Sequence, residues 1–301
     1  MSSSTNGLST FAVLGAGTVG GPIIDAFLDA KLPLTILTRD ASKPELRPYA
    51  QRGAVLKAVD YSSVDSIAEA LQGVDAFVSA LGNQHPPQLP EDLARAAKQA
   101  GVKLFVPSEF GLDYVSEKAK PFPSKIQGKV DHHAFLESLS LPWIAVACSG
   151  FGQFVVHPFL GYDLSKRTVV LLKEGDAPLS LTDTRDIGTF LVKVLTTQPV
   201  PAPGSGRIYR VEGYTTTQRD IISELEKQSG HKFTIIKKSY EEVAAKQTED
   251  SYAAFPAWLQ ASLADGRQKL DNIDNERVGF TPKYTLQDNI KEALEEQAKS
   301  A

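Results

Sequence analysis

The first half of the chain alternates short continuous apolar runs with apolar residues at helical spacing. Such runs predict buried strands, and they cover residues 11–14, 32–38, 54–59, 74–81, 102–106 and 143–147. Between them, apolar residues recur three or four positions apart, as at Ile23 and Phe27. This alternation predicts an α/β fold with a doubly wound parallel sheet covered by helices on both faces. Right-handed crossovers bring the carboxyl ends of its strands to one edge, where ligands bind.

A glycine-rich turn joins the first predicted strand to the first predicted helix. Residues 15–20 read Gly-Ala-Gly-Thr-Val-Gly, in the strand–turn–helix context that a Rossmann dinucleotide site requires. Gly15 permits the tight turn, Gly17 lets the backbone approach a pyrophosphate, and Gly20 lets helix and strand pack closely. With Thr18 and Val19, the helix N-terminus presents N–H groups to the phosphates. The alternative is a glycine-rich turn with no ligand, and the context favours the dinucleotide.

The end of the second predicted strand indicates which dinucleotide is bound. It is occupied by Arg39, with Lys43 just beyond, whereas NAD enzymes usually place a carboxylate there. A guanidinium suits the 2′-phosphate of NADP(H), and Asp40 comes one residue later, where side chains point elsewhere. We therefore predict NADP(H) as cofactor, the alternative being a solvated Arg–Asp pair at a turn. Asp60 and Tyr61 end the third strand, either beside an adenine or in an Asx turn before a helix.

The second half of the chain follows a different pattern. After about residue 154, proline and glycine become frequent, and two further helical segments appear near 218–228 and 286–298. The segment 199–206 reads as a surface loop. We expect a Rossmann domain over residues 1–155 and a smaller, irregular α/β part over 156–301. This second part is expected to cap the cofactor edge and bind substrate, and some of its segments are expected to return to the Rossmann sheet.

Local signals mark helices after the third strand and before the sixth. Residues 62–65 read Ser-Ser-Val-Asp, a capping box that opens a helix at Ser62, and Gly73 closes it. A later helix is expected from about Ser124 to Leu139 and carries Lys129, with His132 and His133 one turn further on.

The ends of the fourth and fifth predicted strands are expected to line the cofactor edge. The edge residues are Ser79, Ala80 and Leu81 after the fourth strand and Pro107, Ser108 and Glu109 after the fifth. A desolvated lysine beside an oxidised nicotinamide has a lowered pKa, because both effects disfavour the ammonium form. It can then exchange a proton near neutral pH. Spacing alone nevertheless favours an ordinary solvated helix lysine at position 129.

Composition argues against several kinds of binding partner. The formal net charge is −4 with no block of like charges, which argues against nucleic acid. The single cysteine, Cys148, excludes an intramolecular disulfide, and the histidines show no metal-ligand spacing, so no metal is expected. No apolar run approaches the roughly 18 residues that span a membrane, and no secretory signal is evident. We expect a cytoplasmic protein, monomer or homodimer, with a small-molecule substrate.

One string in the chain is more specific than the glycine turn. Residues 106–113 read Val-Pro-Ser-Glu-Phe-Gly-Leu-Asp, which resembles the signature of the NmrA-like and isoflavone-reductase-like proteins, a group of atypical short-chain dehydrogenases. The similarity continues through GAGTVGG, LTRD, VDYSSVDSIAEALQGVDAFVSALG and the LPW…SGF segment. It covers essentially the whole chain and is strongest over residues 11–154.

The resemblance assigns roles to particular residues. In that family, a lysine about thirteen residues before the proline that opens the next strand is the proposed general acid/base. Counting back from Pro142 identifies Lys129 rather than Lys125. A glutamine near the start of the helix after the fourth strand often approaches the cofactor, and Gln88 fits best, with Gln84 as its rival. The stretch from residue 181 to 187 resembles a structural segment that joins the two parts.

The turn after the sixth strand departs from the family pattern. Members often carry an Asn-Cys-Phe-like turn beside nicotinamide and substrate, and here the residues are Ser149, Gly150 and Phe151. The aromatic is kept and the asparagine is lost. The residues expected to contact substrate are Phe110, Tyr114, His133, Phe151 and Phe154. Further aromatics that could join an apolar pocket are Tyr162, Tyr252 and Trp258, although core packing is the better interpretation of any single one.

Members of this group either reduce phenolic or benzylic substrates with NADPH or bind the dinucleotide as regulators without turnover. Lys129 and the aromatic residues favour the enzyme. The resemblance therefore implies an NADPH-dependent reductase of a small aromatic or heterocyclic specialised metabolite, with Lys129 handling the proton. The alternatives are a redox-sensing regulator that binds NADP, and a biosynthetic enzyme that couples imine or iminium reduction to a cyclisation.

Overall fold

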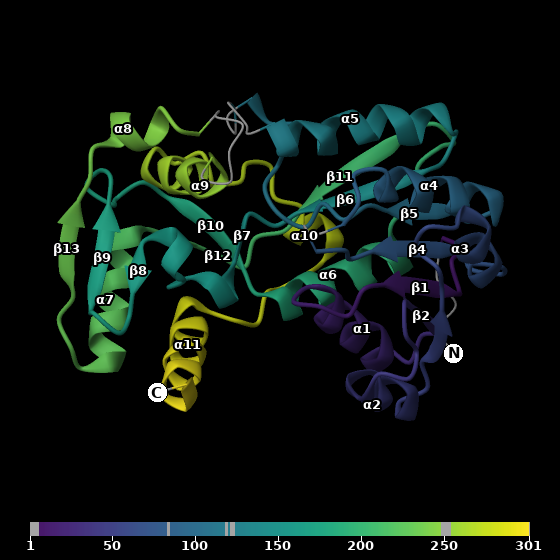
Figure 1. The fold of residues 1–301 in the computed structure, drawn as a ribbon, viewed down its shortest axis with the longest axis horizontal. Helices are drawn as coiled ribbons and strands as arrows, with labels where there is room; N and C mark the ends of the chain where they lie inside the picture. The colour runs from purple at the N-terminus through teal and green to yellow at the C-terminus, as the bar shows by residue number, and fades with distance from the viewer. Residues whose placement is uncertain (1–5, 83–84, 118–119, 121–123, 248–253, 301) are drawn as a thin grey trace.

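A seven-stranded parallel sheet forms the centre of the larger half of the molecule (Figure 1). The computed structural model describes residues 6–82, 85–117, 120, 124–247 and 254–300. The strand order is β11-β6-β5-β4-β1-β2-β3, and all neighbouring pairs are parallel. The strands are β1 (Phe11–Leu14), β2 (Leu34–Thr38), β3 (Val55–Ala58), β4 (Ala76–Ser79), β5 (Leu104–Val106), β6 (Trp143–Ala147) and β11 (Gly206–Arg210). The order reverses beside β1, which is where α/β sheets bind ligands.

Helices cover both faces of this sheet. One face packs on α1 (Gly20–Asp29) and α6 (Thr184–Thr197), and the other on α3 (Val64–Ala70), α4 (Leu89–Gln99) and α5 (Ser124–Ser138). Strand β1 shows how the two layers are divided. Phe11 and Val13 belong to the core under α1 and α6, whereas Ala12 and Leu14 belong to the core under α3 and α4. The predicted doubly wound α/β fold is therefore confirmed.

Two small sheets form the other half of the molecule, at the left of Figure 1. One has the order β12-β10-β7 and the other β13-β9-β8. Their strands are β7 (Gly150–Phe151), β8 (Tyr162–Asp163), β9 (Thr168–Leu171), β10 (Leu179–Thr182), β12 (Tyr214–Thr216) and β13 (Thr234–Lys237). The remaining helices are α2 (Arg47–Gln51), α7 (Gln218–Ser229), α8 (Tyr240–Ala244), α9 (Ala254–Ala264), α10 (Asn275–Val278) and α11 (Leu286–Ser300).

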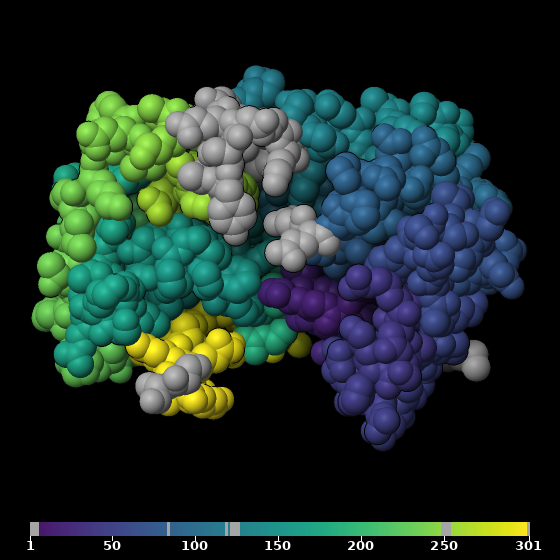
Figure 2. All heavy atoms as spheres, in the orientation of Figure 1, coloured from purple at the N-terminus to yellow at the C-terminus, as the bar shows by residue number. Residues whose placement is uncertain are grey.

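Segments from the second half of the chain complete the large sheet and one of its helix layers. Strand β11 pairs with β6, and α6 packs beside α1. Residues beyond 155 thus contribute to both halves of the molecule, and the division at residue 155 stays a prediction. A notch separates α11 (yellow) from the region of α1 and α2 (purple) in the space-filling view (Figure 2).

Two local expectations need correction. The N-cap of α3 is Ser63, whose hydroxyl accepts from the Ser66 N–H at 3.2 Å, because the Ser62 hydroxyl and N–H are bonded to Asp60. The surface loop ends before residue 206, since Gly206 begins β11. The stretch over residues 181–187 contains the end of β10 and, after the N-cap Asp183, the start of α6.

None of the helices in the described part of the chain is both long and apolar enough to span a membrane.

The contact between α1 and α6 depends on a helical glycine. A Cβ on Gly188 would lie 2.5 Å from the carbonyl oxygen of Pro22, so Gly188→Ala must push the helices apart. We expect a loss of about 1–3 kcal/mol in the free energy of unfolding, measured by chemical denaturation. Gly128→Ala in α5 is the control, because its Cβ would meet nothing within 4 Å. It should stabilise by about 0.5–1 kcal/mol, and equal midpoints for the two variants would contradict this account.

Candidate functional site

The turn from Gly15 to Gly20 has the geometry of a phosphate-binding turn. Gly15 has φ +98°, and a Cβ there would lie 2.7 Å from the carbonyl oxygen of Ala80, which directly follows β4. A Cβ on Gly20 would collide with the Gly15 carbonyl, so the helix enters directly against the turn. Gly17 differs, because its Cβ would meet nothing within 4 Å. No side chain caps α1 at Val19. The turn therefore presents open backbone and a helix N-terminus to an anion.

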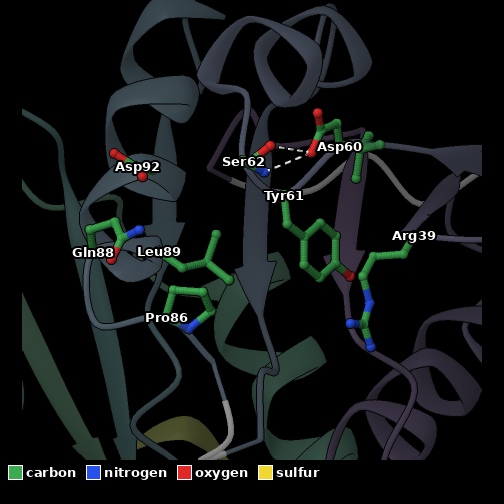
Figure 3. A pocket seen from close by; sticks show the side chains of 9 residues that line it. Arg39, Asp60, Tyr61, Ser62, Pro86, Gln88, Leu89 and Asp92 are labelled. Atoms are coloured by element: carbon green, nitrogen blue, oxygen red, sulfur yellow. Dashed lines mark hydrogen bonds between the residues drawn. The ribbon is translucent and has the colours of Figure 1, made fainter.

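A pocket of about 510 Å³ lies at the carboxyl ends of β2 and β3 (Figure 3). It is lined by Arg39, Val59, Asp60, Tyr61, Ser62, Pro86, Gln88, Leu89 and Asp92. Arg39 and Tyr61 form one wall, with the guanidinium carbon 5.6 Å from the ring centroid. Gln88, at the start of α4, belongs to the opposite wall with Pro86 and Leu89. Such a pocket, with a cation beside an aromatic ring, can hold an adenine and a phosphate.

Two carboxylates near this pocket are engaged by neighbouring serines. Asp40 Oδ1 accepts from the Ser42 hydroxyl at 2.6 Å and from the Ser42 N–H at 2.8 Å, and these bonds hold the Asp40 pKa below its usual value. Asp60 Oδ1 makes the same two contacts with Ser62, at 2.7 and 2.9 Å. Asp60 thus forms the Asx turn that the sequence left open. With Asp40 turned toward Ser42, Arg39 is the charged residue of its strand end that lines the pocket.

Of the other residues predicted to bind this part of the cofactor, Tyr61 lines the pocket and Lys43 does not. Tyr61 is half-buried, and burial raises its pKa. Lys43 does not line the pocket, and its ammonium lies 3.8 Å from the Glu45 carboxylate on an exposed turn. Gln84, the rival of Gln88, falls outside the described residues.

Lys129 reaches the sheet edge between β4 and β5. Its Nζ donates to the Ser108 carbonyl at 3.2 Å and lies 5.0 Å from the centroid of the Tyr114 ring. The Ser108 hydroxyl in turn donates to the Leu81 carbonyl at 2.8 Å. Lys129 is partly buried. The fold thus brings Lys129, Ser108, Tyr114 and Leu81 together, next to the buried residues Ser79 and Pro107.

Two predicted substrate residues lie in the interior. His133 Nε2 is 2.7 Å from Glu109 Oε2, and the His133 ring stacks on Trp143 with centroids 4.1 Å apart. Phe110 packs in the core between the sheet and α1. Their contacts with substrate stay predictions, and burial does not favour them. Trp258 and Tyr162 are also fully buried, as core packing predicts, and Tyr252 lies outside the described residues.

The turn after β6 is held by the second half of the molecule. Ser149 has φ +56°, and its hydroxyl donates to the Gln268 carbonyl at 2.7 Å. Phe151 and Phe154 follow, both partly exposed, with ring centroids 6.0 Å apart. Sequence reasoning missed Gln268, because nothing in its local pattern links it to a residue 119 positions away.

Comparison with known proteins identifies the family of this chain. The model of the NmrA-like family matches residues 8–274. The oxidoreductase aprR of Aspergillus flavus is 30% identical over 224 residues, covering 72% of this chain and 73% of that protein. The isoflavone reductase homolog IRL of Zea mays is 27% identical, covering 88% of this chain and 86% of its own length.

Solved structures show the same fold. An isoflavone reductase crystal structure has a TM-score of 0.80 at 21% identity and covers 95% of this chain and 99% of its own. A leucoanthocyanidin reductase–NADPH complex from Vitis vinifera has a TM-score of 0.78 at 20% identity, with the same coverage. The glycine turn, the 106–113 segment and the match over residues 8–274 together show that this chain belongs to the NmrA-like family.

Proposed function

We propose that this protein is an NADPH-dependent reductase of a small aromatic or heterocyclic compound, with Lys129 as general acid/base. The observation that carries the proposal is the position of Lys129, whose Nζ is bonded to the Ser108 carbonyl at the edge where the glycine turn lies. The relatives support it, because those described above are an oxidoreductase, an isoflavone reductase homolog and reductases, one of them in complex with NADPH.

The residues of the ligand edge fit an NADPH molecule. The open backbone at Gly17 and the uncapped start of α1 suit the pyrophosphate. Arg39 suits the 2′-phosphate, and the Tyr61 ring suits the adenine. Leu81, Ser108 and Phe151 would border the nicotinamide. NADPH bound in this way supplies a hydride to the substrate.

In the proposed reaction, the protein contributes a proton that is held on Lys129 Nζ. The Ser108 carbonyl occupies one of the three N–H donors of the Lys129 ammonium group. Among the described contacts, the remaining donors are left for a substrate oxygen or nitrogen. Lys129 can therefore give a proton to an atom that gains negative charge, or take one from a phenolic hydroxyl. Tyr114, Phe151 and Phe154 would provide the apolar surround for a ring.

Cofactor choice is tested by Arg39→Ala. Loss of a charge-assisted contact to the 2′-phosphate should weaken NADPH binding by about 10- to 100-fold. NADH binding should change much less, because NADH lacks that phosphate. Titration calorimetry with both cofactors measures the difference, and Lys43→Ala, which lies outside the pocket, is the control. An equal loss for NADPH and NADH would remove Arg39 as the selecting residue.

The phosphate turn is tested by two glycine variants. Gly17→Ala should keep the stability of the free protein, since its Cβ meets nothing, but weaken NADPH binding by roughly tenfold or more because the methyl group occupies the approach path. Gly20→Ala should lower stability as well, because its Cβ collides with Gly15. Thermal unfolding with and without NADPH separates the two effects. A Gly17→Ala protein that binds NADPH like the wild type would be evidence against the site.

Catalysis is tested by Lys129→Ala. Removal of a general acid/base should lower kcat by about 100-fold or more, while the Kd for NADPH stays within about threefold, since binding rests on other residues. Lys125→Ala, which removes the alternative candidate lysine, is the control and should retain turnover. If Lys125→Ala loses activity and Lys129→Ala does not, the assignment is wrong. If the wild type oxidises no NADPH with a panel of carbonyl, imine and enone compounds but captures a stable protein partner, the regulator is the better account.

A further inference from the structure

We propose that Glu109 and His133 form a buried positioning pair that sets the place of the Lys129 amine. This inference rests on the proposed reductase function and adds two residues to it. Neither residue needs to touch substrate or cofactor. Their role is to fix the loop after β5 against α5, the two segments between which Lys129 is held.

The pair is short and enclosed. His133 Nε2 and Glu109 Oε2 are 2.7 Å apart, and only 11% and 5% of the two side chains are exposed. Glu109 Oε1 is buried and has no hydrogen-bond partner among the described residues. A half-satisfied carboxylate is costly to bury, and pairs of this kind are weak contributors to stability compared with apolar residues of similar volume. Stability alone therefore does not account for the pair.

The Glu109–His133 pair joins the same two segments as the contact between Lys129 and Ser108. His133 lies four residues after Lys129, hence on the same side of α5, and Glu109 directly follows Ser108. The same helix and the same loop are thus joined twice. One link is Lys129 Nζ to the Ser108 carbonyl, at the partly exposed edge, and the other is His133 to Glu109 in the interior. Water is excluded from the buried contact, so its hydrogen bond is the stronger of the two. This contact therefore determines the position of the Ser108 carbonyl relative to α5.

The His133 ring is itself held by the sheet. It stacks on the Trp143 ring at 4.1 Å with an interplanar angle of 20°. Trp143 lies on β6 and covers Gly206 of the neighbouring β11, where a Cβ would collide with the indole. A series of contacts therefore connects the sheet to the loop after β5, in the order Gly206, Trp143, His133 and Glu109. This stack holds the plane of the imidazole, and within that plane Nε2 lies 2.7 Å from the Glu109 carboxylate.

The adjacent histidine provides a matched control. His132 is buried to the same degree, but its Nε2 has no hydrogen-bond partner among the described residues. Its ring packs on Phe105 and Phe135, and its remaining polar contact is a hydrogen bond to the Pro90 backbone rather than to Glu109. Burial is the main reason that its pKa is lowered. Replacing His132 with phenylalanine keeps the aromatic packing and leaves the Glu109 link intact.

Two measurements on three variants test the proposal. The variants are His133→Phe, which keeps the stack on Trp143 and removes the hydrogen bond, His133→Gln, which restores a donor, and His132→Phe. The first measurement is steady-state turnover, with kcat and KM separated and the NADPH Kd determined directly. The second does not depend on turnover. It is the rate at which acetic anhydride acetylates Lys129, read by mass spectrometry of the digested protein relative to the exposed Lys166.

The expected results separate positioning from general stability. In His133→Phe, kcat should fall roughly 10- to 100-fold through a misplaced proton donor, with the NADPH Kd within about twofold of wild type, since the pair does not line the cofactor pocket. Lys129 should be acetylated about fivefold faster, the factor that losing one ordinary hydrogen bond allows. His133→Gln should recover most of both values, and His132→Phe should match the wild type.

Failure of the positioning pair and failure of the proposed function give different results in these measurements. If His133→Phe matches His132→Phe in kcat and in Lys129 acetylation, the positioning pair is overturned. If no variant, wild type included, turns over any substrate while His133→Phe still speeds acetylation of Lys129, the proposed function fails and the pair stands. Should His133→Phe not fold, Glu109→Gln takes its place and should shift both readouts in the same direction. Wild-type values for that variant would also overturn the proposal.

Discussion

The backbone contact between the glycine turn and Ala80, the residue directly after strand β4, is the constraint on which the rest of the site depends. The alpha carbon of Gly15 faces the Ala80 carbonyl so closely that a methyl group would not fit, and the start of α1 at Gly20 is pressed against Gly15 in the same way. These two approaches aim the helix N-terminus along the sheet edge. Once that edge is defined, the ends of β2, β3, β4 and β5 can only contribute residues to it from fixed positions.

The second half of the molecule completes this edge by fixing one turn. Ser149 donates to the Gln268 carbonyl, Gly150 packs against Leu181, and Gly152 packs against Asn289 of α11. Asn289 is buried and donates to Asp183 Oδ2 at 2.7 Å. It lies beyond residue 274, where the family match ends. The turn that carries Phe151 is thus held in part by a helix that lies beyond the matched residues.

Several polar residues near this edge of the sheet are buried or already bonded to neighbouring residues. The thiol of Cys148 is fully buried and burial raises its pKa, so this single cysteine is suited to packing rather than chemistry. Asp40 and Asp60 are each engaged by a serine two residues later, and Arg39 and Tyr61 form one wall of the pocket at the ends of β2 and β3. Lys129 differs from them, because its described hydrogen bond is to a backbone carbonyl, that of Ser108, rather than to another side chain.

The sequence by itself determined the strands of the large sheet up to β6, the glycine turn and the family, because each depends on residues close together in the chain. Short apolar runs, three glycines within six positions and an eight-residue string need no knowledge of distant contacts. Even the engagement of Asp60 by Ser62 is local, and the sequence left it as one of two alternatives. These features were predictable to within a few residues.

Only the tertiary structure decided which distant segments meet. It placed β11 beside β6 and α6 beside α1, although both follow a stretch that reads as irregular. It turned His133 inward to Glu109, 24 residues away, where the helical pattern alone allowed it to face a substrate. It also joined Ser149 to Gln268 across 119 residues. Such pairings are chosen by how side chains fill a shared interior, and periodicity along one segment carries no information about the partner that will fill it.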